Sequence, residues 1–174
     1  MILTFDNVSK HYDSKHGRTT VMKDVSFSIE KGINFGVLGM NGAGKSTTLK
    51  MIAGSQLPSK GTIKRHAKFS WPLGFSGSFN GSLSGEENLR FACRVYDVPV
   101  KKTLEYVYDF TELGDKLKHP IKTYSSGMRQ KLAYGLSMAI DFDVYLIDET
   151  LAVGDARFIK KCNEVFEEKA KKSS

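Results

Sequence analysis

The feature that most constrains this chain is a glycine-rich loop with the sequence Gly39-Met40-Asn41-Gly42-Ala43-Gly44-Lys45-Ser46. This spacing is that of a phosphate-binding loop, in which successive backbone N–H groups curl inward at the positive end of the following helix. Lys45 can then reach the β- and γ-phosphates, and Ser46 can offer its hydroxyl to a magnesium ion. The loop therefore predicts binding of a nucleoside triphosphate.

The segments on either side of the loop have the pattern that such a loop requires. Residues 33–38 are mostly apolar and predict a buried strand, and residues 47–53 predict a helix that is closed by Gly54. The order of strand, loop and helix indicates an α/β fold.

A second segment with suitable chemistry lies downstream. Residues 143–147 predict an apolar strand that leads directly into Asp148 and Glu149. In an α/β sheet the carboxyl ends of strands face the ligand, so both carboxylates are expected beside the phosphate loop. Asp148 is suited to hold Mg²⁺ through a water, and Glu149 to polarise the attacking water as general base. This pattern is commonplace by itself, but together with Lys45 and Ser46 it indicates a catalytic site.

Length and composition fit one globular domain. The 174 residues are 40% hydrophobic, and neither a membrane-length apolar run nor a signal-peptide pattern occurs, so we expect the chain in the cytoplasm. Cys93 and Cys162 have no paired spacing and are expected to be packing residues. The net charge of +7 is scattered, with small basic clusters that we interpret as solvated or membrane-facing surface. These clusters are Lys64-Arg65, Lys101-Lys102 and residues 169–172.

A third motif narrows the class of protein. Tyr124-Ser125-Ser126-Gly127-Met128-Arg129-Gln130 precedes a helical run at residues 131–139. Ser125 can be a simple N-cap, or the helix start can bind a γ-phosphate, and both interpretations stay open. With these three motifs in order, the chain resembles the ABC transporter ATPases, whose signature is Leu-Ser-Gly-Gly-Gln. Ser125 and Gly127 match that signature; Tyr124, Ser126 and Met128 depart from it.

The resemblance covers nearly the whole chain and implies further roles. It implies a P-loop NTPase core of the RecA-like ABC type, with N-terminal antiparallel strands and an inserted helical subdomain. Tyr12, after Lys10 and His11, is similar to the aromatic residue that stacks on adenine, and the segment 21–27 is similar to the strand that follows. Thr47 completes the ATP contact of residues 39–47. Ser125, Ser126 and Gly127 are expected to contact the ATP of a partner subunit, and Asp155 to lie in the D-loop.

The same resemblance implies organisation and partners. Residues 1–174 are expected to form one nucleotide-binding domain, with its core at about 1–71 and 125–174 and a helical subdomain at about 84–124. The cofactors are ATP and Mg²⁺. The expected partners are a second copy of the chain and an integral-membrane permease, which would contact the transported cargo. The chain would lie peripherally on the cytoplasmic face of the inner membrane, with no direct contact to nucleic acid.

The segment 69–88 points to one branch of the family. It lies where the family carries a glutamine, but contains none, and begins Phe69-Ser70-Trp71-Pro72-Leu73. With the variant signature, it resembles the exporters of capsular polysaccharide; teichoic acid and O-antigen exporters are close alternatives. A soluble ABC protein acting on nucleic acid is a further alternative, supported by the excess of basic residues. Such proteins usually carry two cassettes in one chain, whereas this sequence has a single phosphate loop.

The same segment also predicts local structure. Ser84-Gly85-Glu86-Glu87 is a capping box that opens a helix through Tyr96, and a second helix follows Pro99 until Gly114. Trp71, Phe75 and Phe79 either form a groove for a membrane subunit or belong to the core, and the sequence supports both equally.

The family's later γ-phosphate histidine has no counterpart here. All four histidines, His11, His16, His66 and His119, precede the catalytic strand. We therefore expect the C-terminal end of the core to be missing and the chain to bind ATP but hydrolyse it slowly. Steady-state ATPase rates of this chain and of one extended by the next strand provide the test, and equal rates would contradict the expectation.

Overall fold

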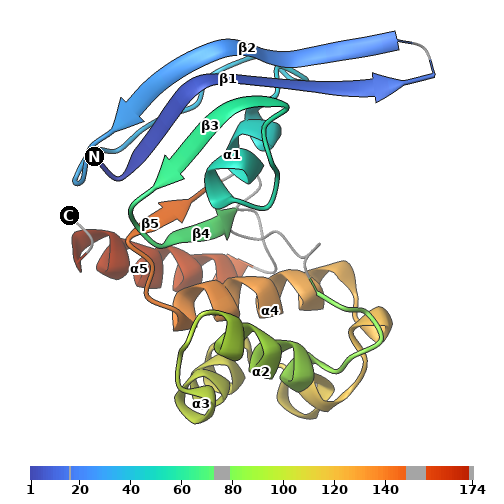
Figure 1. The fold of residues 1–174 in the computed structure, drawn as a ribbon. Coiled ribbons are helices and arrows are strands. Elements are labelled where there is room, and N and C mark those ends of the chain that lie inside the picture. Colours follow the sequence, from blue (N-terminus) through green and yellow to red (C-terminus); the bar gives the residue numbers. More distant parts are fainter. Residues whose placement is uncertain (16, 73–78, 148–155, 173–174) are drawn as a thin grey trace. The chain divides into compact units, whose positions relative to one another are not determined.

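The computed structural model describes residues 1–15, 17–72, 79–147 and 156–172. The chain divides into two compact units. The first comprises residues 1–72, 142–148 and 171–174, and the second comprises residues 73–141 and 149–170. The first unit is built on strands around one helix, whereas the second is built from packed helices (Figure 1).

An antiparallel sheet forms the N-terminal part of the first unit. Its strands are β1 (Leu3–Ser14), β2 (Gly17–Ile29) and β3 (Lys60–Arg65), in the order β2-β1-β3. Leu3 and Phe5 alternate with less buried neighbours along β1, as expected for a strand with one covered face. The expected N-terminal antiparallel strands are therefore confirmed, and Tyr12 lies within β1, opposite Thr19.

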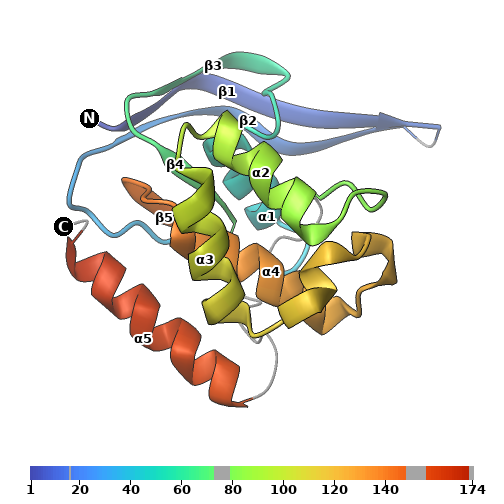
Figure 2. The same cartoon turned by 90° about the horizontal axis from the view of Figure 1, so that it is seen from below.

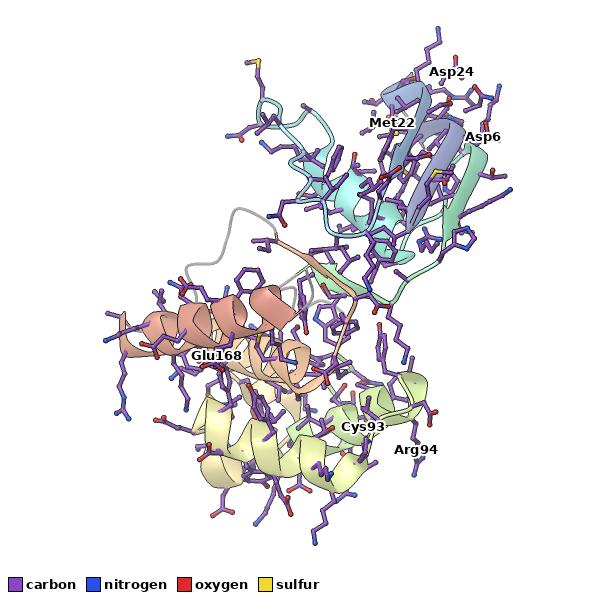
Figure 3. The ribbon with its side chains drawn as sticks, turned by 90° about the vertical axis from the view of Figure 1, so that its left-hand side faces the viewer. Asp6, Met22, Asp24, Cys93, Arg94 and Glu168 are labelled. Carbon is purple, nitrogen blue, oxygen red and sulfur yellow. The ribbon has the colours of Figure 1, made fainter. Side chains whose placement is uncertain are left out.

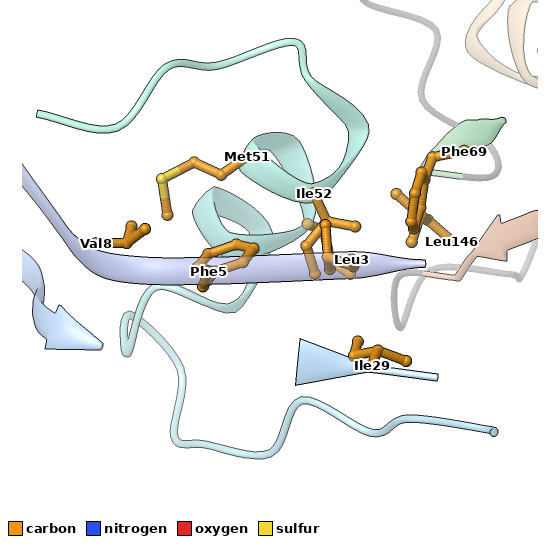
Figure 4. Close-up of a cluster of buried hydrophobic side chains, with 9 residues drawn as sticks. Leu3, Phe5, Val8, Ile29, Met51, Ile52, Phe69 and Leu146 are labelled. Atoms are coloured by element: carbon orange, nitrogen blue, oxygen red, sulfur yellow. The ribbon is translucent and has the colours of Figure 1, made fainter. Parts of the chain in front are cut away.

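Helix α1 (Lys45–Ala53) covers that face of the sheet (Figure 1). Met51 and Ile52 of the helix join Leu3, Phe5 and Val8 in one buried cluster (Figure 4). The helix ends at Gly54, which has a left-handed φ of 80°, so the predicted glycine stop is confirmed.

A parallel pair of strands adds to the same cluster. Strand β4 (Phe69–Pro72) pairs with β5 (Val144–Leu146), and Phe69 and Leu146 are both buried in the cluster (Figure 4). The backbone N–H of Leu146 donates to the buried Ser70 hydroxyl at 2.8 Å. The predicted strand at residues 143–147 is thus confirmed in type, and it is shorter than expected.

The strand predicted at residues 33–38 is wrong. This segment has no regular secondary structure, and Ile33, Phe35 and Leu38 are 57%, 53% and 96% exposed. An apolar run becomes a buried strand only when neighbouring strands hydrogen-bond to it, and none of the described strands pairs with this segment. Phe35 instead stacks on Phe27 of β2, with ring centroids 5.5 Å apart.

Two helices open the second unit. Helix α2 (Gly85–Val95) begins with the predicted capping box: the Glu87 N–H donates to the Ser84 hydroxyl at 3.2 Å, and the Ser84 N–H donates to the Glu87 carboxylate at 2.7 Å. Helix α3 (Val100–Thr111) follows Pro99 as predicted. It ends three residues before Gly114 because Glu112 adopts a left-handed conformation, with φ of 54°.

The second unit has further elements beyond α2 and α3. They are η2 (Gly114–Lys118) and η3 (Ile121–Thr123), which are 3-10 helices, and the helices α4 (Ser126–Ala139) and α5 (Ala156–Lys172) (Figure 2). Phe110 of α3 stacks on Tyr134 of α4 and meets Phe158 of α5 edge-on at 5.4 Å. The Tyr134 hydroxyl donates to the Cys162 carbonyl at 3.2 Å.

The two cysteines behave as expected. Cys93 and Cys162 are 1% and 4% exposed and are not joined in a disulfide. On α2, Cys93 lies on the covered face, whereas its neighbour Arg94 is exposed (Figure 3). Burial raises the pKa of the Cys162 thiol to about 12, so this group packs as an uncharged side chain.

Two of the basic clusters are not wholly solvated surface. Arg65 is only half exposed and donates from Nε to the Ile52 carbonyl at 2.8 Å, which satisfies the C-terminal end of α1. Partial burial lowers the pKa of this guanidinium from its ordinary value. Lys169 donates to Asp141 at 2.5 Å, and its side chain is 18% exposed. The interpretation as surface charge is therefore wrong for Arg65 and Lys169, which serve local packing.

The contact between α3 and α4 generates a stability prediction. A Cβ added at Gly135 would lie 2.6 Å from the Thr111 methyl, and Thr111 is fully buried. We expect Gly135→Ala to destabilise the protein by about 1–3 kcal/mol through overpacking. Gly127→Ala in the same helix meets nothing closer than 4.0 Å and should stabilise by up to ~1 kcal/mol. Urea unfolding followed by circular dichroism measures both, and stabilisation by Gly135→Ala would contradict this account.

Candidate nucleotide-binding site

The phosphate loop has the backbone that its glycines were expected to provide. Gly42 and Gly44 have φ values of 83° and 93°, both in the left-handed region that side chains disfavour. Gly44 is also closely packed, because a Cβ added there would lie 2.1 Å from the Val21 side chain of β2. At this position glycine is therefore required both by conformation and by space.

Helix α1 begins immediately after Gly44, which turns its N-terminal N–H groups toward the loop. Gly44 has no side chain that could cap those groups, and the first turn of this described helix contains no acidic residue. The Lys45 ammonium donates to the Gly39 carbonyl at 2.7 Å, so it lies across the loop. The positive end of a helix with a nearby ammonium suits a phosphate chain, and these residues therefore fit a triphosphate.

Tyr12 lies beside the start of α1. Its hydroxyl is 3.4 Å from the Thr47 hydroxyl and accepts a hydrogen bond from the Gln56 side-chain amide at 2.5 Å. The Lys10 ammonium lies 5.2 Å from the ring centroid, and Tyr12 remains 42% exposed. An accessible ring next to a phosphate loop can stack on a nucleotide base.

The pKa of the Tyr12 phenol is lowered from its ordinary value. The hydrogen bond with Thr47 is the main cause, the one with Gln56 adds to it, and the charges of Lys10 and Lys50 act in the same direction. Partial burial opposes this shift. The phenol is therefore held by polar partners on one side while the ring remains exposed.

The variant signature lies in the second unit, at the start of α4. Ser125 is the N-cap, and its hydroxyl accepts a hydrogen bond from the Met128 N–H at 3.2 Å. The simple structural interpretation of Ser125 is thus confirmed. Ser126 and Gly127 form the first turn of the helix, and an added Cβ at Gly127 would meet nothing closer than 4.0 Å, so this helix start is open.

Several predicted site residues lie outside the described residues. Asp148 and Glu149 follow directly on the described segment that ends at Ile147, and Asp155 immediately precedes the segment that begins at Ala156. Phe75 is also outside it, while Trp71 is half-buried and meets Phe142 edge-on with centroids 5.4 Å apart. Trp71 therefore takes part in local packing, and the described residues provide no basis for a groove at this position.

One contact of the site was not anticipated from the sequence. Gln56 follows the end of α1 and reaches Tyr12, which is 44 positions earlier in the chain. A glutamine in a polar turn carries no pattern of its own, so only the fold could reveal this pairing.

The described part of the chain contains neither a cluster of metal-binding side chains nor a membrane-spanning helix. Among the described residues no group of three or more His, Cys, Asp or Glu side chains could hold a metal ion. Ser46, the expected magnesium ligand, begins the first turn of α1 with Lys45. No helix within the described ranges is long and apolar enough to cross a membrane.

A phosphate loop at the start of a helix, packed under an antiparallel sheet, defines a P-loop nucleotide-binding fold. Residues 22–152 match the ABC transporter family, and the chain belongs to that family. It is 50% identical over 173 residues to the capsule polysaccharide export ATP-binding protein CtrD of Neisseria meningitidis serogroup B, covering 99% of this chain and 80% of CtrD. It is 49% identical to the ATP-binding protein BexA of Haemophilus influenzae, with the same coverage.

A solved structure supports the same fold. The structure of an ATP-binding subunit of an ABC transporter superposes with a TM-score of 0.76 at 26% identity, and the match covers 99% of this chain and 76% of that one. The expected ABC ATPase fold is thereby confirmed.

The packing of Gly44 generates a binding prediction. Gly44→Ala introduces an alanine in a strained left-handed conformation and a clash with Val21. The loop must therefore shift, and its N–H groups would no longer point toward the phosphates. We expect the dissociation constant for MgATP to rise at least about tenfold. Gly36→Ala is the matched control, because its Cβ would meet nothing within 4 Å. Isothermal titration calorimetry measures both, and unchanged affinity in Gly44→Ala would refute the assignment of this loop.

Proposed function

We propose that this chain is the ATP-binding and hydrolysing subunit of an ABC transporter that exports capsular polysaccharide across the inner membrane. The observation that carries the proposal is the identity of 50% and 49% with CtrD and BexA over 99% of the chain. The glycine geometry of the phosphate loop supports nucleotide binding, and the Ser70-Trp71-Pro72-Leu73 segment and the variant signature support this branch of the family.

The chain's own residues divide the work on ATP. Residues 39–47 bind the phosphates through backbone N–H groups, Lys45 neutralises charge on the β- and γ-phosphates, and Tyr12 stacks on adenine. Ser46 and Asp148 would hold Mg²⁺, which offsets negative charge on the phosphates when it is bound. Glu149 accepts a proton from the attacking water as general base.

The proposed assembly is a head-to-tail homodimer on a membrane permease. The two compact units of each chain form one nucleotide-binding domain in this proposal. Ser125, Ser126 and Gly127 of one subunit contact the ATP held by the other, and Asp155 lies in the loop between the two sites. The motor rests on the cytoplasmic face of the inner membrane, while the permease contacts the glycan.

The protein encoded by the neighbouring gene distinguishes capsule export from a soluble role on nucleic acid. An exporter subunit requires a permease, so a neighbouring gene should encode a protein with six membrane-spanning helices. Purification of the chain together with that permease from membranes is the direct test. Recovery of the chain only with ribosomes or nucleic acid would overturn the transport assignment.

The general base generates a catalytic prediction. Glu149→Gln keeps the size of the side chain but cannot accept the proton, so we expect MgATP affinity within about threefold of the parent and turnover reduced at least ~100-fold. The variant should also accumulate as an ATP-bound dimer in size-exclusion chromatography. Single-turnover hydrolysis with protein in excess resolves slow rates.

Glu168→Gln is the matched control for that experiment. Glu168 is an exposed carboxylate on α5 (Figure 3), and its removal should leave turnover unchanged. Parent-level turnover in Glu149→Gln would remove Glu149 from the role of general base.

A further inference from the structure

The turn after α1 folds back along the helix and is fastened to β1. The Gln56 N–H donates to the Lys50 carbonyl at 3.2 Å, which brings the turn back toward the middle of the helix. The Ser59 N–H donates to the Ser9 carbonyl at 2.8 Å, and the Ser59 hydroxyl accepts from the His11 N–H at 3.1 Å. These bonds hold residues 56–59 against the strand that carries Tyr12.

Two contacts from this turn reach Tyr12 and its neighbour. Gln56 donates from its side-chain amide to the Tyr12 hydroxyl at 2.5 Å. The Leu57 carbonyl accepts from the Lys10 ammonium at 2.8 Å, and that ammonium lies over the Tyr12 ring at 5.2 Å from its centroid. The turn therefore holds the phenol at its oxygen and fixes the cation that covers the ring.

The Gln56 side chain uses its amide nitrogen, Nε2, for the hydrogen bond to Tyr12. Its carbonyl oxygen Oε1 is buried and has no hydrogen-bond partner within the described part of the chain. The position of this amide is set by the backbone and side-chain bonds that hold its turn against β1.

We propose that Gln56 is a positioning residue for the nucleotide base, acting by holding the Tyr12 ring in the orientation that stacks on adenine. This inference rests on the proposed binding of ATP. An exposed tyrosine loses rotational freedom when a ligand stacks on it, and a ring that is already held loses less. The contact between the Tyr12 and Thr47 hydroxyls then aligns the held ring with the start of α1.

A double-mutant cycle tests the proposal. The variants are Gln56→Ala, Tyr12→Phe and the double variant, and the ligands are MgATP and inorganic tripolyphosphate with Mg²⁺, both measured by calorimetry. Both single variants remove the hydrogen bond between Gln56 and Tyr12, and Tyr12→Phe also removes the contact with Thr47. We therefore expect the dissociation constant for MgATP to rise about threefold to tenfold in Gln56→Ala and at least as much in Tyr12→Phe. The double variant should lose no more than Tyr12→Phe alone, because that variant has already lost the bond to Gln56. The affinity for tripolyphosphate, which has no base, should stay unchanged.

Ser55→Ala is the matched control in the same turn. The Ser55 hydroxyl donates to the Lys50 carbonyl at 3.1 Å and is exposed, so its removal should leave MgATP affinity at the parent level. Thermal denaturation shows that all variants are folded before titration. A second base-dependent readout is the affinity for MgADP, which should fall by the same factor as that for MgATP.

Three results would overturn the inference alone: parent affinity for MgATP in Gln56→Ala, an equal loss for tripolyphosphate, or additive losses in the double variant. An equal loss for tripolyphosphate would mean that Gln56 supports the phosphate loop rather than the ring. Failure of the folded parent chain to bind MgATP at all would instead overturn the proposed function, and this inference with it.

Discussion

The left-handed conformation of Gly44, packed against Val21, is the constraint on which the nucleotide-binding unit depends. It fixes the direction in which the chain enters α1, because the helix begins at the next residue. It also fixes the distance between the helix start and β2, since no Cβ fits between them. This one close approach therefore sets the direction of the helix N–H groups. It also sets the positions of Lys45 and of Thr47, which lies beside Tyr12.

Local chemistry made much of this structure predictable. The glycine loop, the capping box at Ser84, the N-cap at Ser125 and the stop at Gly54 are each decided by a few adjacent residues, and the structure confirms them. The strand predicted at residues 33–38 failed because a strand exists only through its neighbours, which a sequence pattern does not specify. The bond from Gln56 to Tyr12 was missed for the same reason, since it joins residues 44 positions apart.

The departure of the signature motif at Tyr124 has a packing explanation. Tyr124 is 4% exposed, and its hydroxyl donates to the Lys116 carbonyl at 2.6 Å, so it joins η2 to the start of α4. A Cβ at Gly85 would lie 2.5 Å from that hydroxyl, which explains why α2 begins with glycine. The tyrosine therefore changes how the helices of the second unit pack, while the N-cap at Ser125 remains available at the helix start.

In the proposed motor, some residues would set the affinity for ATP, and others would couple ATP binding to closure of the dimer. Nucleotide binding shifts an equilibrium between open and closed dimers only through contacts that differ between the two states. Tyr12, Lys45 and Gln56 all belong to one compact unit, so they would hold ATP equally in both states and set affinity alone. Ser125 and Gly127 would meet ATP only in the closed dimer. A change at Gln56 should therefore shift the ATP concentration at which the dimer closes, whereas a change at Ser125 should alter the closing equilibrium itself.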